Sequence, residues 1–359
     1  MEKTDIRSLS FSELEHLILE MGERPFRAGQ IYGWLHQKTV TDFEQMGNLP
    51  KQLRKRLSES CNLTVLKPVQ VKVSSIDKTR KYLFQLADGN VIESVWMQYH
   101  HGCSVCISSQ VGCRMGCKFC ASTLEGLERD LTAAEMLEQV YRIQALSEER
   151  ISHIVLMGSG EPFDNYENVV RFLRLVSDER GFHISLRNIT VSTCGIVPGI
   201  RRFAEEGLPV TLALSLHAPK DKVRRELMPV AKSYPLDEVL DACREYFTKT
   251  GRRLTFEYSL VKNVNDNPGE AMALARLLKG MHGHVNLIPV NPVSERNFVR
   301  SDKRAILEFQ RILEQAGIAV TVRREMGRDI QGACGQLRRS FLEKKEQGSI
   351  DPGKENKGG

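Results

Sequence analysis

The sequence predicts an α/β protein in which six β/α units form a partial barrel, preceded by a small helical domain and a β connector. Three observations predict this fold. Apolar residues of the first 65 positions recur at helical spacing, whereas residues 66–98 carry only strand patterns around a turn at 88–90. From residue 99 to about 340, strand and helical patterns alternate, which is typical of a parallel sheet covered by helices. Such folds place their chemistry at the carboxyl ends of the strands.

The N-terminal domain, residues 1–65, is predicted to hold three helices. The first follows Ser8 and Ser10, which are candidate caps, and the second carries Trp34. The third begins after Pro50 and is basic. Its cations are Lys51, Arg54, Lys55 and Arg56. A basic helix near a candidate exposed aromatic side chain suits a polyanion, so we expect this domain to contact RNA.

The connector, residues 66–98, is predicted to contribute strands at 69–73, 82–86 and 91–97. The barrel strands are expected at 104–109, 153–157, 188–192, 210–216, 254–260 and 284–289, with a further short strand at 320–322. The helices between them are expected at 133–146, 166–176, 200–206, 236–248, 270–278 and 303–315. The barrel and a C-terminal loop are expected to occupy residues 99–340. Residues 341–359 are polar and Gly-rich and are predicted to be disordered.

The composition favours an ordinary globular protein. The 359 residues are 41% hydrophobic and 27% charged, and no stretch approaches the about 18 apolar residues of a membrane span. The N-terminus has no apolar segment behind a basic start, so we expect a cytoplasmic protein without a membrane partner. The formal net charge of +6 and several paired cations suit RNA, but the same side chains could be solvated and balanced by acids. Charge alone does not decide between these interpretations.

Cysteine spacing is more informative than charge. Five of the nine cysteines lie between positions 103 and 120. Cys113, Cys117 and Cys120 follow the first barrel strand, and thiolates are the ligands of iron–sulfur clusters. Three protein thiolates leave the fourth iron open to a chelating substrate. A structural zinc ion is the alternative, with Cys103 or Cys106 as a fourth ligand, although zinc modules usually show two separated ligand pairs.

A Cys-x-x-x-Cys-x-x-Cys triad with an aromatic residue before the last cysteine resembles the signature of the radical S-adenosylmethionine (SAM) superfamily. The resemblance implies a 4Fe–4S cluster on Cys113, Cys117 and Cys120. It also implies a SAM pocket at the strand ends, where Gly160 lets the backbone approach closely and Glu161 could receive the ammonium group. The other residues expected to bind SAM are Ser192, Ser215, Leu216, His217 and Asn291.

A closer resemblance extends over roughly residues 5–340. The stretches 106–113, 215–219, 286–292 and 333–337 are similar to the RlmN and Cfr group of RNA adenosine methyltransferases. This resemblance implies methylation of adenine carbon 2 in 23S rRNA and in tRNA. It further implies two SAM molecules per turnover and an electron donor such as flavodoxin. The segment 158–162, the stretch 194–198 and the ending 290–292 look more like the RlmN type.

The same resemblance implies roles for three further residues. One SAM methylates Cys334, and a radical made from the second SAM takes a hydrogen atom from that methyl group. The carbon radical adds to adenine, Glu93 removes the proton from the adenine carbon, and Cys106 releases the product by forming a disulfide with Cys334. A thioether weakens the adjacent C–H bond and a thiolate is a good nucleophile, which suits this route. Gly332 before Ala333 departs from the usual family pattern and bears on loop flexibility.

Two alternatives stay open at this level. A Cfr-like enzyme would methylate carbon 8 of adenine in 23S rRNA. A noncatalytic RNA-binding protein with structural zinc would explain the cysteines, but not Glu161, Ser192, Asn291 and Cys334 together.

Overall fold

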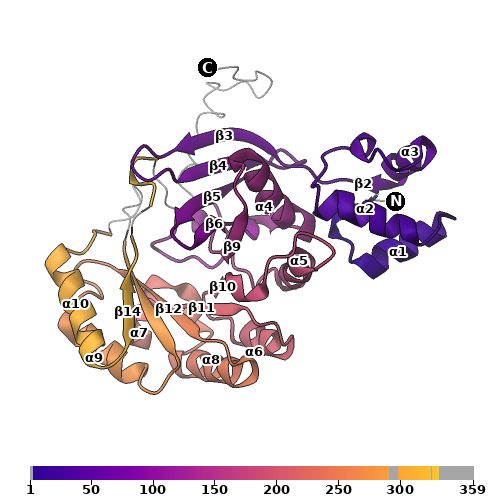
Figure 1. Ribbon diagram of the computed structural model, residues 1–359. Coiled ribbons are helices and arrows are strands. Elements are labelled where there is room, and N and C mark those ends of the chain that lie inside the picture. Colours follow the sequence, from indigo (N-terminus) through magenta and orange to yellow (C-terminus); the bar gives the residue numbers. More distant parts are fainter. Residues whose placement is uncertain (1–2, 291–297, 325, 331–359) are drawn as a thin grey trace.

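The computed structural model describes residues 3–290, 298–324 and 326–330. Its centre is a ten-stranded sheet with the order β14-β13-β12-β11-β10-β9-β6-β5-β4-β3 (Figure 1). The strands, in chain order, are β3 Lys67–Val73, β4 Arg80–Gln85, β5 Val91–Tyr99, β6 Gly102–Cys106, β9 Ile151–Leu156, β10 Ile189–Thr193, β11 Thr211–Ser215, β12 Leu254–Leu260, β13 Gly283–Pro289 and β14 Ala319–Val322.

The expected partial barrel is formed by strands that run parallel to one another, namely β6, β9, β10, β11, β12, β13 and β14. Helices on the outer face connect them: α4 Ala133–Ser147, α5 Tyr166–Ser177, α6 Val197–Glu205, α8 Leu236–Thr250, α9 Pro268–Leu277 and α10 Lys303–Gln315. The three strands expected as a connector, β3 to β5, extend the same sheet in antiparallel fashion. The fold class predicted from the sequence is confirmed.

Strand β12 shows how the two faces of the sheet differ. Leu254, Phe256 and Tyr258 belong to the large hydrophobic core that the barrel shares with its helices. Alternate side chains of a strand point to opposite faces, so Thr255, Glu257 and Ser259 face the barrel interior. Glu257 and Ser259 line the cavity described below. The interior of the barrel is therefore polar where its outer face is apolar.

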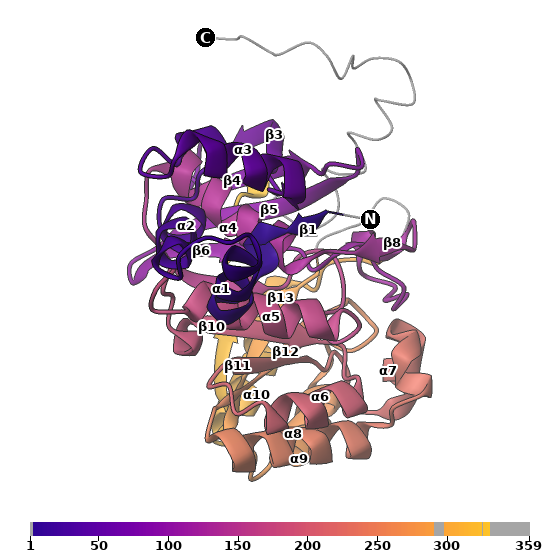
Figure 2. The ribbon, with the colours of Figure 1, turned by 90° about the vertical axis from the view of Figure 1, so that its right-hand side faces the viewer.

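The N-terminal domain contains α1 Phe11–Glu20, α2 Phe26–His36 and α3 Lys51–Ser60 beside a short pairing of β1 Thr4–Asp5 with β2 Cys61–Asn62 (Figure 2). Ser10 and Glu13 form a capping box that fixes the start of α1. The domain has a hydrophobic core of its own. Trp34 is not an exposed aromatic as expected, because it is half-buried and its indole N–H donates to Asn48 at 2.5 Å.

A buried polar junction joins this domain to the barrel. The Arg7 guanidinium pairs with Glu138 of α4, and both side chains are fully buried. His36 of α2 forms a hydrogen bond of 2.9 Å with the Tyr141 hydroxyl, and burial lowers the pKa of His36 to about 3. Tyr32 donates to Asp178 at 3.1 Å.

Some elements were not expected from the sequence. The hairpin of β7 Gln110–Gly112 and β8 Leu127–Asp130 frames the cysteine loop, and the short helix α7 Asp221–Leu227 lies below it. The first barrel strand ends at Cys106, three residues earlier than predicted. Within the described ranges, no helix is long and apolar enough to cross a membrane.

Candidate active site

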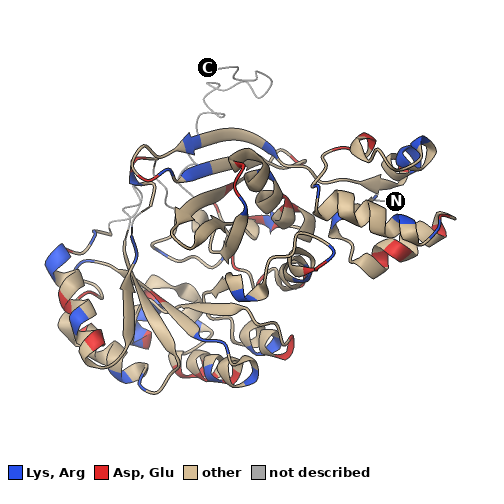
Figure 3. Ribbon diagram, viewed as in Figure 1, with Lys and Arg blue, Asp and Glu red and all other residues tan. Residues whose placement is uncertain are grey.

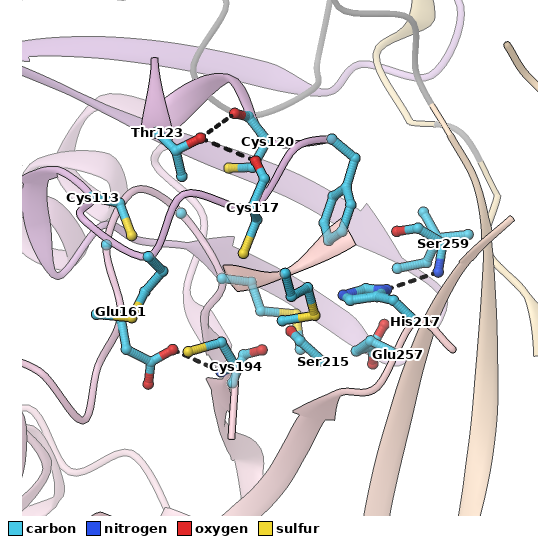
Figure 4. A pocket seen from close by; sticks show the side chains of 18 of the residues that line it. Cys113, Cys117, Cys120, Thr123, Glu161, Cys194, Ser215, His217, Glu257 and Ser259 are labelled. Atoms are coloured by element: carbon cyan, nitrogen blue, oxygen red, sulfur yellow. Dashed lines mark hydrogen bonds between the residues drawn. The ribbon is translucent and has the colours of Figure 1, made fainter. Parts of the chain in front are cut away.

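A cavity of about 250 Å³ opens at the carboxyl ends of the barrel strands. Its walls include all three cysteines of the triad (Figure 4). They also include five of the residues expected to bind SAM. These five are Gly160, Glu161, Ser192, Ser215 and His217. Met115, Phe119 and Met228 add apolar walls. The structure thus gathers in one place side chains that are about 100 residues apart in the sequence.

The cysteine loop is held by its own backbone. Gly112 has a φ of +78°, and a Cβ there would lie 2.0 Å from the carbonyl oxygen of Gly126. Only glycine therefore permits the tight turn into Cys113, whose N–H donates to that same carbonyl at 2.8 Å. At the other end of the loop, the Thr123 hydroxyl lies 3.0 Å from the Cys117 carbonyl and 2.9 Å from the Cys120 carbonyl.

The glycine-rich turn after β9 packs directly on the turn after β6. A Cβ on Gly158 would lie 2.7 Å from the Ile107 carbonyl oxygen, and one on Gly160 would lie 2.6 Å from the Ser109 hydroxyl. Gly160 also has a φ of +109°. Both glycines are needed for close approach of the two backbones, which brings the turn carrying Glu161 against the loop that leads to Cys113.

The Glu161 carboxylate is buried beneath this turn. Its two oxygens accept the backbone N–H groups of Phe163 at 3.1 Å and Cys194 at 2.7 Å. Burial raises the pKa of Glu161, while these hydrogen bonds favour its ionised form. The carboxylate therefore ties the ends of β9 and β10 together, in addition to facing the cavity.

His217 lies two residues after the end of the neighbouring strand β11, in a left-handed conformation with a φ of 57°. Its Nδ1 accepts the backbone N–H of Ser259 at 2.9 Å, and its ring packs edge-on against Phe119. Burial lowers the pKa of His217 to about 3. The imidazole is therefore neutral at physiological pH and carries its proton on Nε2.

A row of polar side chains crosses the barrel interior below His217. Ser215, Glu257, Asn286 and Thr321 are partners in register across β11, β12, β13 and β14. The Asn286 amide donates to Glu257 at 2.8 Å, and the Thr321 hydroxyl lies 3.1 Å from the Asn286 oxygen. Burial raises the pKa of Glu257 to about 7. An acid that titrates near neutral pH therefore lines the cavity.

Cys106 lies next to this cavity, and Glu93 points to the same face of the sheet as Cys106. Val95 pairs in register with Cys106, and Glu93 is two residues before Val95, so both side chains point to one face of the sheet. Cys106 belongs to a small apolar cluster that contacts Met157, which also lines the cavity. The Glu93 carboxylate is 3.0 Å from the ammonium group of buried Lys81.

The remaining predicted residues are placed as follows. The Leu216 side chain is buried in the hydrophobic core and does not line the cavity, although its N–H donates to the Glu257 carbonyl at 3.0 Å. Asn291 and Cys334 lie outside the described residues. The proposed roles of all these side chains remain predictions.

Sequence reasoning missed three residues of the site. Cys194 is not part of the cysteine motif, but it lines the cavity and its backbone N–H donates to the Glu161 carboxylate. Glu257 lies in a strand of alternating apolar and polar residues, where no local motif marks it as part of the site. Arg224 is fully buried, and its guanidinium donates to the carbonyls of Cys194 at 2.7 Å and Leu216 at 3.3 Å. Arg224 therefore holds together the chain segments that follow β10 and β11.

The donor set fits an iron–sulfur cluster. Three cysteines and no carboxylate come from the loop itself, and thiolates are the ligands such clusters take. Burial raises the pKa of Cys113 to about 12 and also raises the pKa of Cys117, so both are thiols until a metal displaces the proton. No three His, Cys, Asp or Glu side chains of the described residues are gathered closely enough for a single ion, whereas a cluster offers each thiolate a separate iron.

Comparison with known proteins agrees with this site. Residues 4–63 match the family described as the ribosomal RNA large subunit methyltransferase N-terminal domain. Residues 107–275 match the radical SAM superfamily. Two proteins named probable dual-specificity RNA methyltransferase RlmN are close relatives. The protein from Lachnospira eligens is 55% identical, covering 95% of this chain and 97% of its own length. The protein from Lachnoclostridium phytofermentans is 58% identical, covering 96% of each chain.

A solved structure extends the similarity to three dimensions. The crystal structure of a radical SAM methyltransferase from Sphaerobacter thermophilus superimposes with a TM-score of 0.88 at 44% sequence identity. The match covers 93% of this chain and 98% of that one. Membership of the radical SAM superfamily implies a 4Fe–4S cluster and SAM. The chain belongs to the RlmN family of radical SAM RNA methyltransferases.

Proposed function

We propose that this enzyme methylates carbon 2 of an adenine in 23S rRNA and in tRNA, through a methylated Cys334. The observation that carries the proposal is the position of Glu93 and Cys106 on one face of adjacent strands, next to the cavity that the three cysteines line. The relatives named dual-specificity RNA methyltransferase support two classes of RNA substrate.

The cysteine loop and the strand ends have separate tasks in this proposal. When bound, a 4Fe–4S cluster on Cys113, Cys117 and Cys120 supplies one electron that cleaves SAM into methionine and a 5′-deoxyadenosyl radical. The turn with Gly160 and Glu161, together with Ser192, Ser215, Leu216, His217 and Asn291, would hold SAM. The apolar walls of the cavity exclude water from the reactive species.

Cys334 carries the methyl group that reaches the RNA. A first SAM methylates its sulfur, so two SAM molecules are used per turnover, with a donor such as flavodoxin as the electron source. The radical takes a hydrogen atom from the S-methyl group, and the resulting carbon radical adds to the adenine carbon. The adduct radical then returns one electron to the oxidised electron source, which balances the electron used to cleave SAM. The adenine carbon is electrophilic and has no nucleophilic lone pair. It therefore cannot attack the methyl group of SAM, as ordinary methyl transfer requires.

Glu93 and Cys106 complete the reaction. Glu93 accepts the proton that leaves the adenine carbon, and its carboxylate lies 3.0 Å from the ammonium group of Lys81 in a buried position. The Cys106 thiolate attacks the Cys334 sulfur, so that an S–S bond forms and the S–C bond breaks. The electron pair of the S–C bond stays with the transferred carbon, which takes up a proton to complete the methyl group of the released base. The disulfide is then reduced before the next cycle.

Mass spectrometry of nucleosides tests the assigned carbon. Reconstituted enzyme, SAM and a reductant are incubated without oxygen with a 23S rRNA fragment or with tRNA, and the RNA is digested. The proposal expects 2-methyladenosine from both RNAs. An 8-methyladenosine product would overturn the assignment to carbon 2, and product from only one RNA would remove the dual specificity.

A further inference from the structure

A short segment after β14 connects the two edges of the sheet. We call residues 326–330 the strap. It follows β14, one edge strand of the ten-stranded sheet, and contacts the turn between β3 and β4 at the opposite edge (Figure 1). Met326 packs against the apolar cluster of Val95, Met97 and Cys106. The strap therefore crosses the open side of the barrel next to Cys106.

One carboxylate holds the strap to the β3–β4 turn. Asp329 accepts the Ser74 hydroxyl at 2.6 Å, the Ser75 backbone N–H at 2.8 Å and the Ser75 hydroxyl at 2.9 Å. The bond from Ser74, with those from Ser75, lowers the pKa of Asp329 below its ordinary value. Three donors on one ionised side chain define both the distance and the direction of the attachment.

A second contact fixes the other half of the strap. The Gly327 N–H donates to Asp77 of the same turn at 2.9 Å. Gly327 has a φ of +62°, and a Cβ there would lie 3.1 Å from Thr79 and from Ile330. Ile330 is buried against this glycine. The strap is thus held by polar contacts on its edge and by close packing at its centre.

We infer that Asp329, held by Ser74 and Ser75, is a positioning residue that fixes where the chain leaves the barrel for Cys334. This inference rests on the proposed function, in which Cys334 carries the methyl group. Cys334 is the fourth residue after Ile330, and four residues of extended chain span at most about 14 Å. Hydrogen transfer requires reacting atoms about 3–3.5 Å apart, so a displaced attachment point lowers the fraction of radicals that reach the methyl group.

The measurable consequence is uncoupling. With dithionite as the reductant, each cleavage consumes one electron and breaks the SAM C5′–S bond. The 5′-deoxyadenosyl radical takes a hydrogen atom from the S-methyl group when that group is in place, and from a C–H bond of buffer glycerol when it is not. Both routes give 5′-deoxyadenosine, but only the first leads to methylated RNA.

The test compares Asp329→Ala with the wild type in full-length, reconstituted enzyme. We expect the ratio of 5′-deoxyadenosine to methyl groups on RNA to rise at least threefold, with iron content and SAM affinity unchanged. Loss of folded enzyme alone would lower both products together and leave their ratio constant. Asp88→Ala is the matched control, because Asp88 lies in the neighbouring β4–β5 turn and contacts Asn90 and Arg129, not the strap.

Two further variants keep the test decisive. If Asp329→Ala does not load iron, the double variant Ser74→Ala/Ser75→Ala removes two of the same hydrogen bonds and should also raise the ratio. A ratio equal to that of the wild type in the folded variant overturns the positioning role. Cys334→Ala separates this result from the proposed function: if that variant still methylates RNA, the methyl-cysteine route fails, whatever the strap variants do.

Discussion

Glu257 is the residue whose chemistry depends most on its surroundings. It is 5% exposed, and burial raises its pKa to about 7, although the Asn286 amide and the Arg323 cation oppose that rise. The nearby His217 is neutral because burial lowers its pKa to about 3. The folded chain therefore keeps a proton on Glu257 between about pH 4.5 and pH 7, whereas the unfolded chain releases it.

This proton makes stability depend on pH with a defined sign. The folded state binds more protons than the unfolded state in that window, so the Glu257 contribution to stability falls as pH rises, by up to about 3 kcal/mol in total. Glu257→Gln mimics the neutral acid. Urea unfolding should show the variant to be more stable than the wild type, by about 2 kcal/mol more at pH 8 than at pH 5.5. The exposed Glu226→Gln is the control. An unchanged difference between the two pH values would contradict the raised pKa.

The residues of the site differ in how far sequence could predict them. The three cysteines and the segment with Gly160 and Glu161 form local motifs, and the structure brings them to one cavity. Glu257 and Arg224 act through partners that are distant in the sequence, such as Asn286 and the Cys194 carbonyl. No local pattern encodes those contacts, because they arise only when neighbouring strands align.

At the scale of elements, helix α3 carries the RNA-binding prediction. Arg54 is held within the domain, because its guanidinium donates to the Glu44 carbonyl at 2.7 Å and only 17% of its side chain is exposed. Arg56 pairs with Glu23 at 3.1 Å. Lys51 and Lys55 are exposed and lie one turn apart on the same face of the helix. Figure 3 shows the basic residues of α3 in blue. These two lysines are therefore the better candidates for phosphate contacts.

Charge reversal of both lysines tests that prediction. Lys51→Glu/Lys55→Glu should weaken RNA binding at fixed salt and reduce the slope of log K against log salt by about 2, since each phosphate contact contributes roughly 0.7–0.9. Binding is measured by fluorescence anisotropy with labelled tRNA at several salt concentrations between about 50 and 200 mM. Over this range the binding constant changes enough to determine the slope. Lys303→Glu/Arg304→Glu on α10 makes the same charge change on the barrel. Equal effects of the two double variants would remove α3 from the RNA interface.

Elements with strong periodicity were predictable, and short elements set by tertiary contacts were not. The barrel strands and their helices follow alternating and helical patterns that the chain carries locally. Helix α7 has only seven residues, and the β7–β8 hairpin depends on Gly112 meeting Gly126. Such features need the rest of the fold before their backbone groups find partners.

At the scale of the whole molecule, the N-terminal domain and the barrel each have a hydrophobic core, and the buried polar junction joins the two. Arg7 pairs with Glu138 in full burial and also donates to the carbonyls of Thr64 at 2.7 Å and Val40 at 2.5 Å. Arg142 is the second cation near Glu138, at 3.3 Å. The junction thus fixes the orientation of the N-terminal domain relative to the barrel.

Removing the Arg7 side chain should therefore lower the free energy of unfolding. Arg7→Ala leaves a buried carboxylate with one partner fewer, and breaking a buried pair costs about 3–5 kcal/mol. Urea unfolding at neutral pH measures the loss, and Arg171→Ala at the exposed pair with Glu13 is the control. A loss below about 1 kcal/mol, typical of exposed pairs, would show that the junction contributes little.

The central claim is that the methyl group reaches RNA through Cys334. The most direct measurement incubates reconstituted wild type and Cys334→Ala without oxygen with labelled SAM, a reductant and RNA, then quantifies 5′-deoxyadenosine and methyladenosine. The account predicts both products from the wild type and no methylated RNA from Cys334→Ala. Methylated RNA from the Cys334→Ala enzyme would contradict the methyl-cysteine route and leave the radical SAM assignment alone standing.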